Sequence, residues 1–168
     1  MERCEVCGFA WDEVASDEVP AGVRAAGAAL GGLLVDHPEA AGRATAAGRW
    51  SPLEYGCHVR DVLLNLRDRI VLALVADDPV PHPMAGTPRV ELGLYARDEP
   101  ATTARDLVVA ADLFARTVEC LPAGTGGRTM TYGWPTVASR SIDWVAAQAL
   151  HECRHHLDDV RGDLPGPD

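Results

Sequence analysis

The sequence contains no lysine, so arginine supplies all 15 of its basic side chains. Acidic residues number 25, and the formal net charge is −10. Proteins that bind nucleic acids need clustered Lys and Arg to neutralise phosphates. The charge balance therefore argues against a nucleic-acid partner.

A signal peptide is also lacking, because Met1-Glu2-Arg3-Cys4 is not followed by the apolar core of a secretory signal. No apolar run approaches the length that we expect of a membrane span. We therefore expect a cytoplasmic protein with no membrane partner. In that compartment the five cysteines are expected to be thiols or metal ligands rather than a disulfide framework.

Neither a Gly-rich phosphate loop nor a Ser nucleophile elbow occurs in the sequence. It does contain a histidine-rich decapeptide, residues 150–159, with three of the chain's six histidines. His151 and His155 are four residues apart, so a helix places both imidazoles on one face, where they can bind one metal ion. His156 points about 100° away from His155 and is not counted as a ligand.

A third ligand is predicted on the helix over residues 52–75. Ser51 is its expected N-cap, Pro52 occupies the first helical position, and Glu54 completes a capping box. A polar stripe of this helix carries His58. The sequence thus predicts that His58 joins the histidine pair of the decapeptide.

Three neutral imidazoles, from His58, His151 and His155, would hold one divalent ion and leave positions open for water or substrate. That is the arrangement of catalytic rather than structural sites. Zn²⁺ is the expected ion, with Ni²⁺, Fe²⁺ and Mn²⁺ as alternatives. The ion would lower the pKa of a water molecule or a thiol and so provide a nucleophile at neutral pH.

Three carboxylates lie one turn beyond these histidines: Asp61, Asp158 and Asp159. Each is a candidate for orienting an imidazole by a hydrogen bond, and the alternative is a solvated helix carboxylate. A C-x-x-C pattern at Cys4 and Cys7 has three interpretations: a redox pair, half of a second metal site, or two unremarkable thiols.

The apolar periodicity predicts an all-α single domain over residues 1–168, in which residues 1–19 form an N-terminal C-x-x-C extension. A Pro-rich connection, residues 77–100, is either a pocket wall or a rigid spacer, and residues 128–134 suggest a small hairpin. Four helices with one long middle connection indicate a four-helix bundle with a crossover. The predicted helices are 20–36, 52–75, 102–121 (capped by Thr102 or Thr103) and 139 or 141 to 161.

Three stretches together resemble the DinB/YfiT-like superfamily over residues 15–162: Trp50-Ser51-Pro52-Leu53-Glu54-x-x-x-His58-x-x-Asp61, Tyr95-x-x-x-Asp98-Glu99-Pro100 and His151-Glu152-x-x-His155-His156-x-x-Asp159-Val160. That superfamily includes mycothiol-dependent maleylpyruvate isomerase-like proteins and thiol S-transferases. The resemblance implies an up-down-down-up bundle, a homodimer, and a divalent metal on three histidines. By position, these are His58, His151 and His155. It also implies a low-molecular-weight thiol, such as mycothiol or bacillithiol, that the metal activates.

The isomerase-type members have Glu where this chain has His151, so the resemblance favours the S-transferase branch. We expect a metal-dependent thiol S-transferase that acts on a small-molecule electrophile. One alternative is a non-catalytic metal-binding or redox-responsive protein that uses Cys4 and Cys7. Another is a metal-dependent hydrolase.

Overall fold

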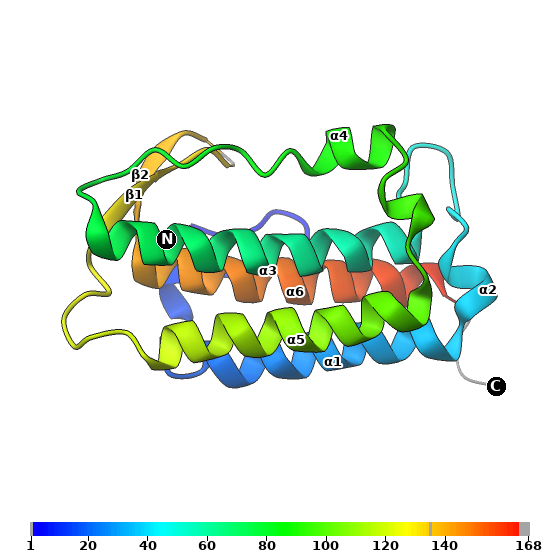
Figure 1. The fold of residues 1–168 in the computed structure, drawn as a ribbon, viewed down its shortest axis with the longest axis horizontal. Helices are drawn as coiled ribbons and strands as arrows, with labels where there is room; N and C mark the ends of the chain where they lie inside the picture. The colour runs from blue at the N-terminus through cyan, green and yellow to red at the C-terminus, as the bar shows by residue number, and fades with distance from the viewer. Residues whose placement is uncertain (1, 135, 165–168) are drawn as a thin grey trace.

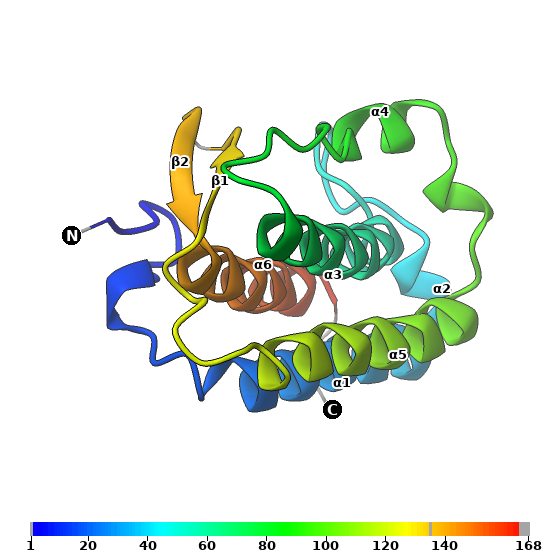
Figure 2. The same ribbon diagram turned by 60° about the vertical axis from the view of Figure 1, so that its left-hand side comes forward.

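The computed structural model describes residues 2–134 and 136–164, and it shows four long helices in two layers (Figures 1 and 2). These helices are α1 (Val19–Asp36), α3 (Pro52–Val75), α5 (Pro100–Glu119) and α6 (Ile142–Asp163). α1 and α6 run in one direction and α3 and α5 in the other, so the order is up-down-down-up. The predicted all-α four-helix bundle is confirmed.

Shorter elements lie around the bundle. The crossover from α3 to α5 passes over α3 and carries α4, while a two-stranded antiparallel hairpin precedes α6 (Figure 2). The hairpin confirms the extended piece that the sequence predicts. These elements are η1 (Trp11–Glu13), α2 (Pro38–Ala41), α4 (Gly86–Glu91), η2 (Tyr95–Arg97), β1 (Thr129–Tyr132) and β2 (Ala138–Ser141). The predicted domain also includes positions 1, 135 and 165–168, which lie outside the described residues.

Local capping fixes where the site-bearing helices begin. The backbone N–H of Ser51 donates to Glu54 Oε2 at 2.7 Å, and the Ser51 hydroxyl accepts from the Glu54 N–H, so the predicted capping box of α3 is present. α6 begins after Ser141, whose hydroxyl accepts from a backbone N–H of its first turn. α5 begins earlier than predicted, at Pro100, because proline's fixed φ suits the first helical position.

Helix α1 packs closely on α5 because small residues face each other. A Cβ at Gly31 would lie 3.2 Å from the backbone oxygen of Ala104. By length and composition α1 is also apolar enough to cross a membrane, with a mean hydropathy of 1.2. The expectation that no apolar run approaches such a length is therefore wrong for α1. Its buried residues, such as Leu30 and Leu34, pack in the bundle core, and the core helices of soluble proteins meet the same criterion.

Candidate functional site

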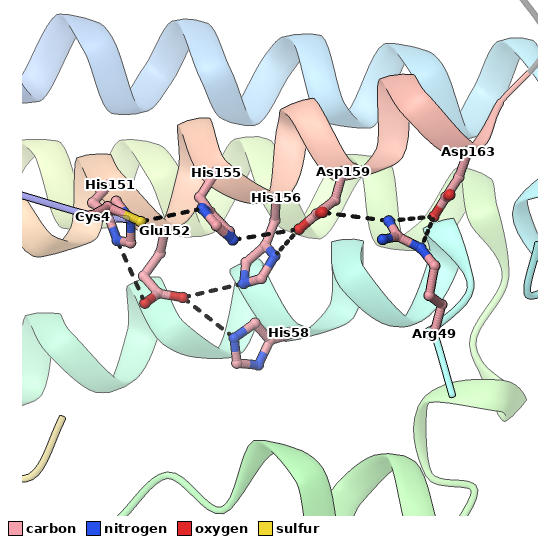
Figure 3. A network of polar contacts seen from close by, with 9 residues as sticks. All are labelled: Cys4, Arg49, His58, His151, Glu152, His155, His156, Asp159 and Asp163. Atoms are coloured by element: carbon pink, nitrogen blue, oxygen red, sulfur yellow. Dashed lines mark hydrogen bonds and ion pairs between the residues drawn. The ribbon is translucent and has the colours of Figure 1, made fainter. Parts of the chain in front are cut away.

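Helix α6 presents two interlocked pairs of metal-binding side chains (Figure 3). His151 and His155 form one pair, and Glu152 and His156 form the other. Both pairs have the four-residue spacing of a helix face, but neighbouring residues diverge by about 100°, so the pairs face different partners.

The Glu152/His156 pair meets α3 in a group that we call the α3–α6 cluster: His58, Glu152 and His156. Glu152 Oε2 lies 3.4 Å from His58 Nε2 and 3.3 Å from His156 Nε2. All three side chains are largely buried, each with less than one-sixth of its surface exposed. One carboxylate oxygen and two imidazole nitrogens thus converge on one point between the helices.

The His151/His155 pair meets the N-terminal segment in the cysteine–histidine cluster: Cys4, Cys7, His151 and His155. One ligand atom from each residue lies within 4.8 Å of the others, and Cys4 Sγ lies 3.9 Å from His155 Nδ1. The C-x-x-C pair, whose role the sequence leaves open, therefore lies against the helix histidines.

Among residues 2–134 and 136–164, the structure does not bring His58 together with His151 and His155. The physical reason is the rotation of α6 about its axis. The face of α6 that meets α3 carries Glu152 and His156, each one residue after His151 and His155. Sequence reasoning missed these two residues, although they share the spacing of His151 and His155. Residues 151–155 also spell the His-Glu-x-x-His pattern of zinc peptidases, but here Glu152 belongs to a different cluster from both histidines.

Of the three candidate orienting carboxylates, Asp159 does contact the site. Its Oδ2 lies 3.0 Å from His156 Nδ1 and 3.7 Å from His155 Nε2. Arg49 holds the same carboxylate at 3.4 Å (Figure 3). Asp159 therefore fixes the ring of His156, so that its other nitrogen faces Glu152.

The other two carboxylates lie elsewhere. Asp158 is exposed and contacts Arg161 of the neighbouring turn at 3.4 Å, so it is a solvated helix carboxylate. Asp61 accepts from Tyr95 Oη at 2.9 Å and also from Arg60 and Arg89. Asp61 does not orient His58, whose Nδ1 is buried without a hydrogen-bond partner in the described part of the chain.

Hydrogen bonds within the α3–α6 cluster set the charges of Glu152 and His156. Burial favours a protonated Glu152, but hydrogen bonds with His156 and His58 outweigh it and hold the pKa of this carboxyl far below its usual range. Burial opposes a charge on His156, yet hydrogen bonds to Asp159 and Glu152 raise the pKa of this imidazole to about 9. Glu152 is therefore a carboxylate at neutral pH, and His156 carries a proton that a metal ion has to displace.

A buried relay connects this carboxylate to the N-terminal segment. Trp11 Nε1 donates to Gln148 Oε1 at 2.7 Å, and Gln148 Nε2 donates to Glu152 Oε1 at 2.6 Å. Gln148 is fully buried. The relay occupies one oxygen of Glu152 and leaves Oε2 facing the two imidazoles.

The donor set of the α3–α6 cluster fits a divalent ion. Metal–ligand bonds of about 2.0–2.2 Å place the ligand atoms of a tetrahedral site roughly 3.3–3.6 Å apart. The separations of 3.3 and 3.4 Å match that range. Two imidazoles and one carboxylate leave at least one position open, as in catalytic sites.

A pocket of about 600 Å³ adjoins both clusters. Its wall includes residues 81 and 83–87 of the crossover and 132–134 of the hairpin region, so the Pro-rich connection does line a pocket. Trp50, Met84 and Trp134 give this wall a mainly apolar surface. The pocket suits an organic molecule beside the open position of the α3–α6 cluster.

Comparison with known proteins supports the fold. The model of the DinB superfamily matches residues 23–160. No curated protein matches the sequence significantly. Among solved structures, YfiT from Bacillus subtilis superposes with a TM-score of 0.79 at 14% identity, covering 90% of this chain and 89% of that one. YfiT is described as a probable metal-dependent hydrolase with an unusual four-helix bundle topology.

Proposed function

Because the chain belongs to the DinB superfamily, we propose that it is a divalent-metal-dependent thiol S-transferase whose ion is held by His58, Glu152 and His156. The observation that carries this proposal is the convergence of Glu152 Oε2, 3.3 and 3.4 Å from the Nε2 atoms of His156 and His58, beside a pocket of about 600 Å³. In this proposal Glu152 and His156 take the place of the predicted ligands His151 and His155. With a glutamate among the ligands, the ligand set no longer separates the S-transferase branch from the isomerase branch, and the transfer proposal rests on the thiol that both branches use.

The composition of the cluster favours an anionic nucleophile. A divalent ion with two neutral imidazoles and one carboxylate keeps a net charge of +1. An ion held there lowers the pKa of a thiol or a water molecule. A thiol is the nucleophile that the family resemblance implies, and the apolar wall formed by Trp50, Met84 and Trp134 suits a carbon electrophile.

The residues around the α3–α6 cluster orient its ligands and line the pocket. Asp159 holds the His156 ring, and Gln148 holds the Glu152 carboxylate, so both ligands are positioned before substrate arrives. The crossover and the hairpin region line the pocket beside the cluster, where they would limit the water around an electrophile. In the transfer, the thiol proton leaves to solvent, sulfur bonds to the electrophilic carbon, and the leaving group departs with its bonding pair.

Hydrolysis is the second candidate function. Two histidines and one glutamate are the ligand set of several hydrolytic zinc enzymes, and YfiT carries the description of a probable metal-dependent hydrolase. In this alternative, the ion would activate water instead of a thiol. The same residues would orient the ligands.

The test uses zinc-loaded protein with mycothiol and monochlorobimane, and records conjugate formation after subtraction of a reaction without mycothiol, which accounts for the protein's own thiols. We expect His156→Ala to lower the rate at least roughly 100-fold, because even groups that only orient a ligand are worth about 10–100-fold. His37→Ala, which changes a histidine at the end of α1, is the matched control.

Each outcome decides between the candidates. Equal rates for wild type, His37→Ala and His156→Ala would overturn the transferase. Turnover of an activated ester without thiol, lost in His156→Ala, would favour the hydrolase. If His156→Ala affects neither reaction but lowers the metal content, the chain is a metal-binding protein without these activities.

A further inference from the structure

Four side chains outside the α3–α6 cluster have the composition of a complete metal site. Cys4 and Cys7 supply two thiols, and His151 and His155 supply two imidazoles, all with ligand atoms within 4.8 Å of one another. Bonds of about 2.3 Å to sulfur and 2.0–2.1 Å to nitrogen place the ligand atoms of a tetrahedral zinc site roughly 3.3–3.8 Å apart. The 3.9 Å between Cys4 Sγ and His155 Nδ1 is close to that range.

The N-terminal segment is folded so as to present both thiols together. The Cys4 N–H donates to the Phe9 carbonyl at 2.8 Å, and the Gly8 N–H donates to the Cys4 carbonyl at 2.9 Å. Gly8 has φ +73°, a left-handed conformation that glycine adopts without strain. This tight turn places Cys4 and Cys7 on the side that faces α6.

His151 supplies an independent observation. The residue is 98% buried, and neither ring nitrogen has a hydrogen-bond partner among the described residues; Nδ1 lies 3.9 Å from Glu152 Oε1, beyond hydrogen-bond distance. A buried polar group without a partner costs roughly 1–3 kcal/mol. Aromatic rings of Phe9 and Trp11 hold the imidazole, with ring centroids 5.2 and 4.8 Å away, but neither offers it a hydrogen bond. A metal ion would satisfy one of these nitrogens.

We propose that Cys4, Cys7, His151 and His155 form a second, closed zinc site that pins the N-terminal segment to α6. Its ligand spacings, C-x₂-C and H-x₃-H, are those of structural zinc sites, and four protein ligands leave no position for substrate. Two thiolates and two imidazoles select Zn²⁺ over the harder divalent ions. This site is therefore structural, whereas the α3–α6 cluster keeps an open position.

The second site also shapes the pocket of the first. Cys4 and Val6 lie in the wall of the pocket that adjoins His58 and His156. Trp11, in the same N-terminal segment, begins the hydrogen-bond relay to Glu152. A zinc ion that holds this segment in place would thereby complete the wall and support the orientation of Glu152.

The experiment measures zinc per full-length chain by elemental analysis, together with the optical spectrum of the cobalt-substituted protein. We expect two zinc ions in wild type, one in the Cys4→Ser/Cys7→Ser variant and one in the His58→Ala/His156→Ala variant. A sulfur-to-cobalt charge-transfer band should appear in wild type and in His58→Ala/His156→Ala, and vanish in Cys4→Ser/Cys7→Ser. The exposed Cys120 provides the matched control, since Cys120→Ser should keep both ions and the band.

Two results would overturn the second site: an unchanged zinc content and cobalt band in Cys4→Ser/Cys7→Ser, or a native mass lower by two hydrogens that shows a Cys4–Cys7 disulfide in the purified protein. Far-ultraviolet circular dichroism checks that each variant keeps its helices. The cysteines lie outside the bundle, so their replacement should not unfold it. If the wild type lacks an ion in the α3–α6 cluster alone, the proposed function fails. The thiolate band then remains, and the second site stands.

Discussion

His156 has to exchange a proton for a metal ion. Its imidazole lies between two carboxylates, with Nδ1 3.0 Å from Asp159 and Nε2 3.3 Å from Glu152. These contacts outweigh burial and raise the pKa of the metal-free side chain to about 9. At pH 7 the ring is therefore protonated until an ion arrives.

We predict that zinc binding to the α3–α6 cluster releases about one proton at pH 7, and that the apparent affinity rises as the pH increases toward about 9. Below about pH 9 a proton competes with zinc for His156, so the apparent zinc affinity falls as the pH decreases. Isothermal titration calorimetry in two buffers of different ionisation enthalpy measures the proton count. The Cys4→Ser/Cys7→Ser variant isolates this cluster from the thiols.

Asp159→Asn supplies the comparison, because it removes one of the two charges that favour the protonated ring. Zinc binding at pH 7 should then release fewer protons than it does in the parent variant. A pH-independent zinc affinity between pH 6 and 9 in the parent would contradict the prediction.

Gln148 is a buried positioning residue between Trp11 and Glu152. Gln148→Ala leaves the Trp11 N–H and one Glu152 oxygen without their hydrogen bonds. We expect a loss of about 1–3 kcal/mol in the free energy of unfolding by urea, together with a weaker zinc affinity. Asp158→Ala, at an exposed carboxylate of the same helix, should change stability by no more than about 0.5 kcal/mol. Equal stability of the two variants would refute the relay.

At the scale of the elements, the start of α3 could be predicted from sequence but helix phase could not. Ser51, Pro52 and Glu54 define the start of α3 by local hydrogen bonds, which depend only on neighbouring residues. Which pair of α6 faces α3 depends on packing between distant helices. His151 and Glu152 each begin a pair with the right spacing, so the spacing alone could not choose between them.

The first residue of the short helix α4, Gly86, packs against His58. A Cβ at Gly86 would lie 2.9 Å from His58 Nδ1 and 3.0 Å from the Met84 methyl group. We predict that Gly86→Ala displaces the His58 ring and lowers zinc affinity at the α3–α6 cluster by about 10-fold or more. Equilibrium dialysis of the Cys4→Ser/Cys7→Ser background, with and without Gly86→Ala, measures the change.

The matched control is Gly32→Ala on α1. Within the described residues, a Cβ there meets nothing within 4 Å. Alanine should raise stability by roughly 0.5–1 kcal/mol, because glycine loses more conformational freedom in a helix, and leave zinc affinity unchanged. Equal zinc affinities of the two alanine variants would show that α4 does not support His58.

For the whole molecule, apolar periodicity was enough to predict the bundle. Leu30, Leu63, Phe114 and Leu150, one from each long helix, are fully buried in a common core. Periodicity contains no information about an N-terminal segment that folds back from outside this core, so the meeting of Cys4 with His155 could not be predicted. A cytoplasmic location and a homodimer stay predictions.

We predict that a chelator loosens the N-terminal segment and leaves the bundle folded. The core is built from the apolar faces of the four helices and needs no ion to pack. With chelator, limited proteolysis should cut residues 2–13 sooner while far-ultraviolet circular dichroism stays helical. Cys4→Ser/Cys7→Ser should be cut as quickly without chelator. Protection of the segment in both cases would show that packing alone holds it.

The distance along the chain between Cys4 and His155 has a consequence for the unfolded state. Their contact joins positions 151 residues apart, so an ion shared by them ties nearly the whole chain into one loop. In the chain-entropy model, a permanent cross-link closing a loop of that length removes disorder worth about 5 kcal/mol at 25 °C from the unfolded ensemble. While the ion remains bound, it acts as a reversible counterpart of a disulfide between the two ends of the protein.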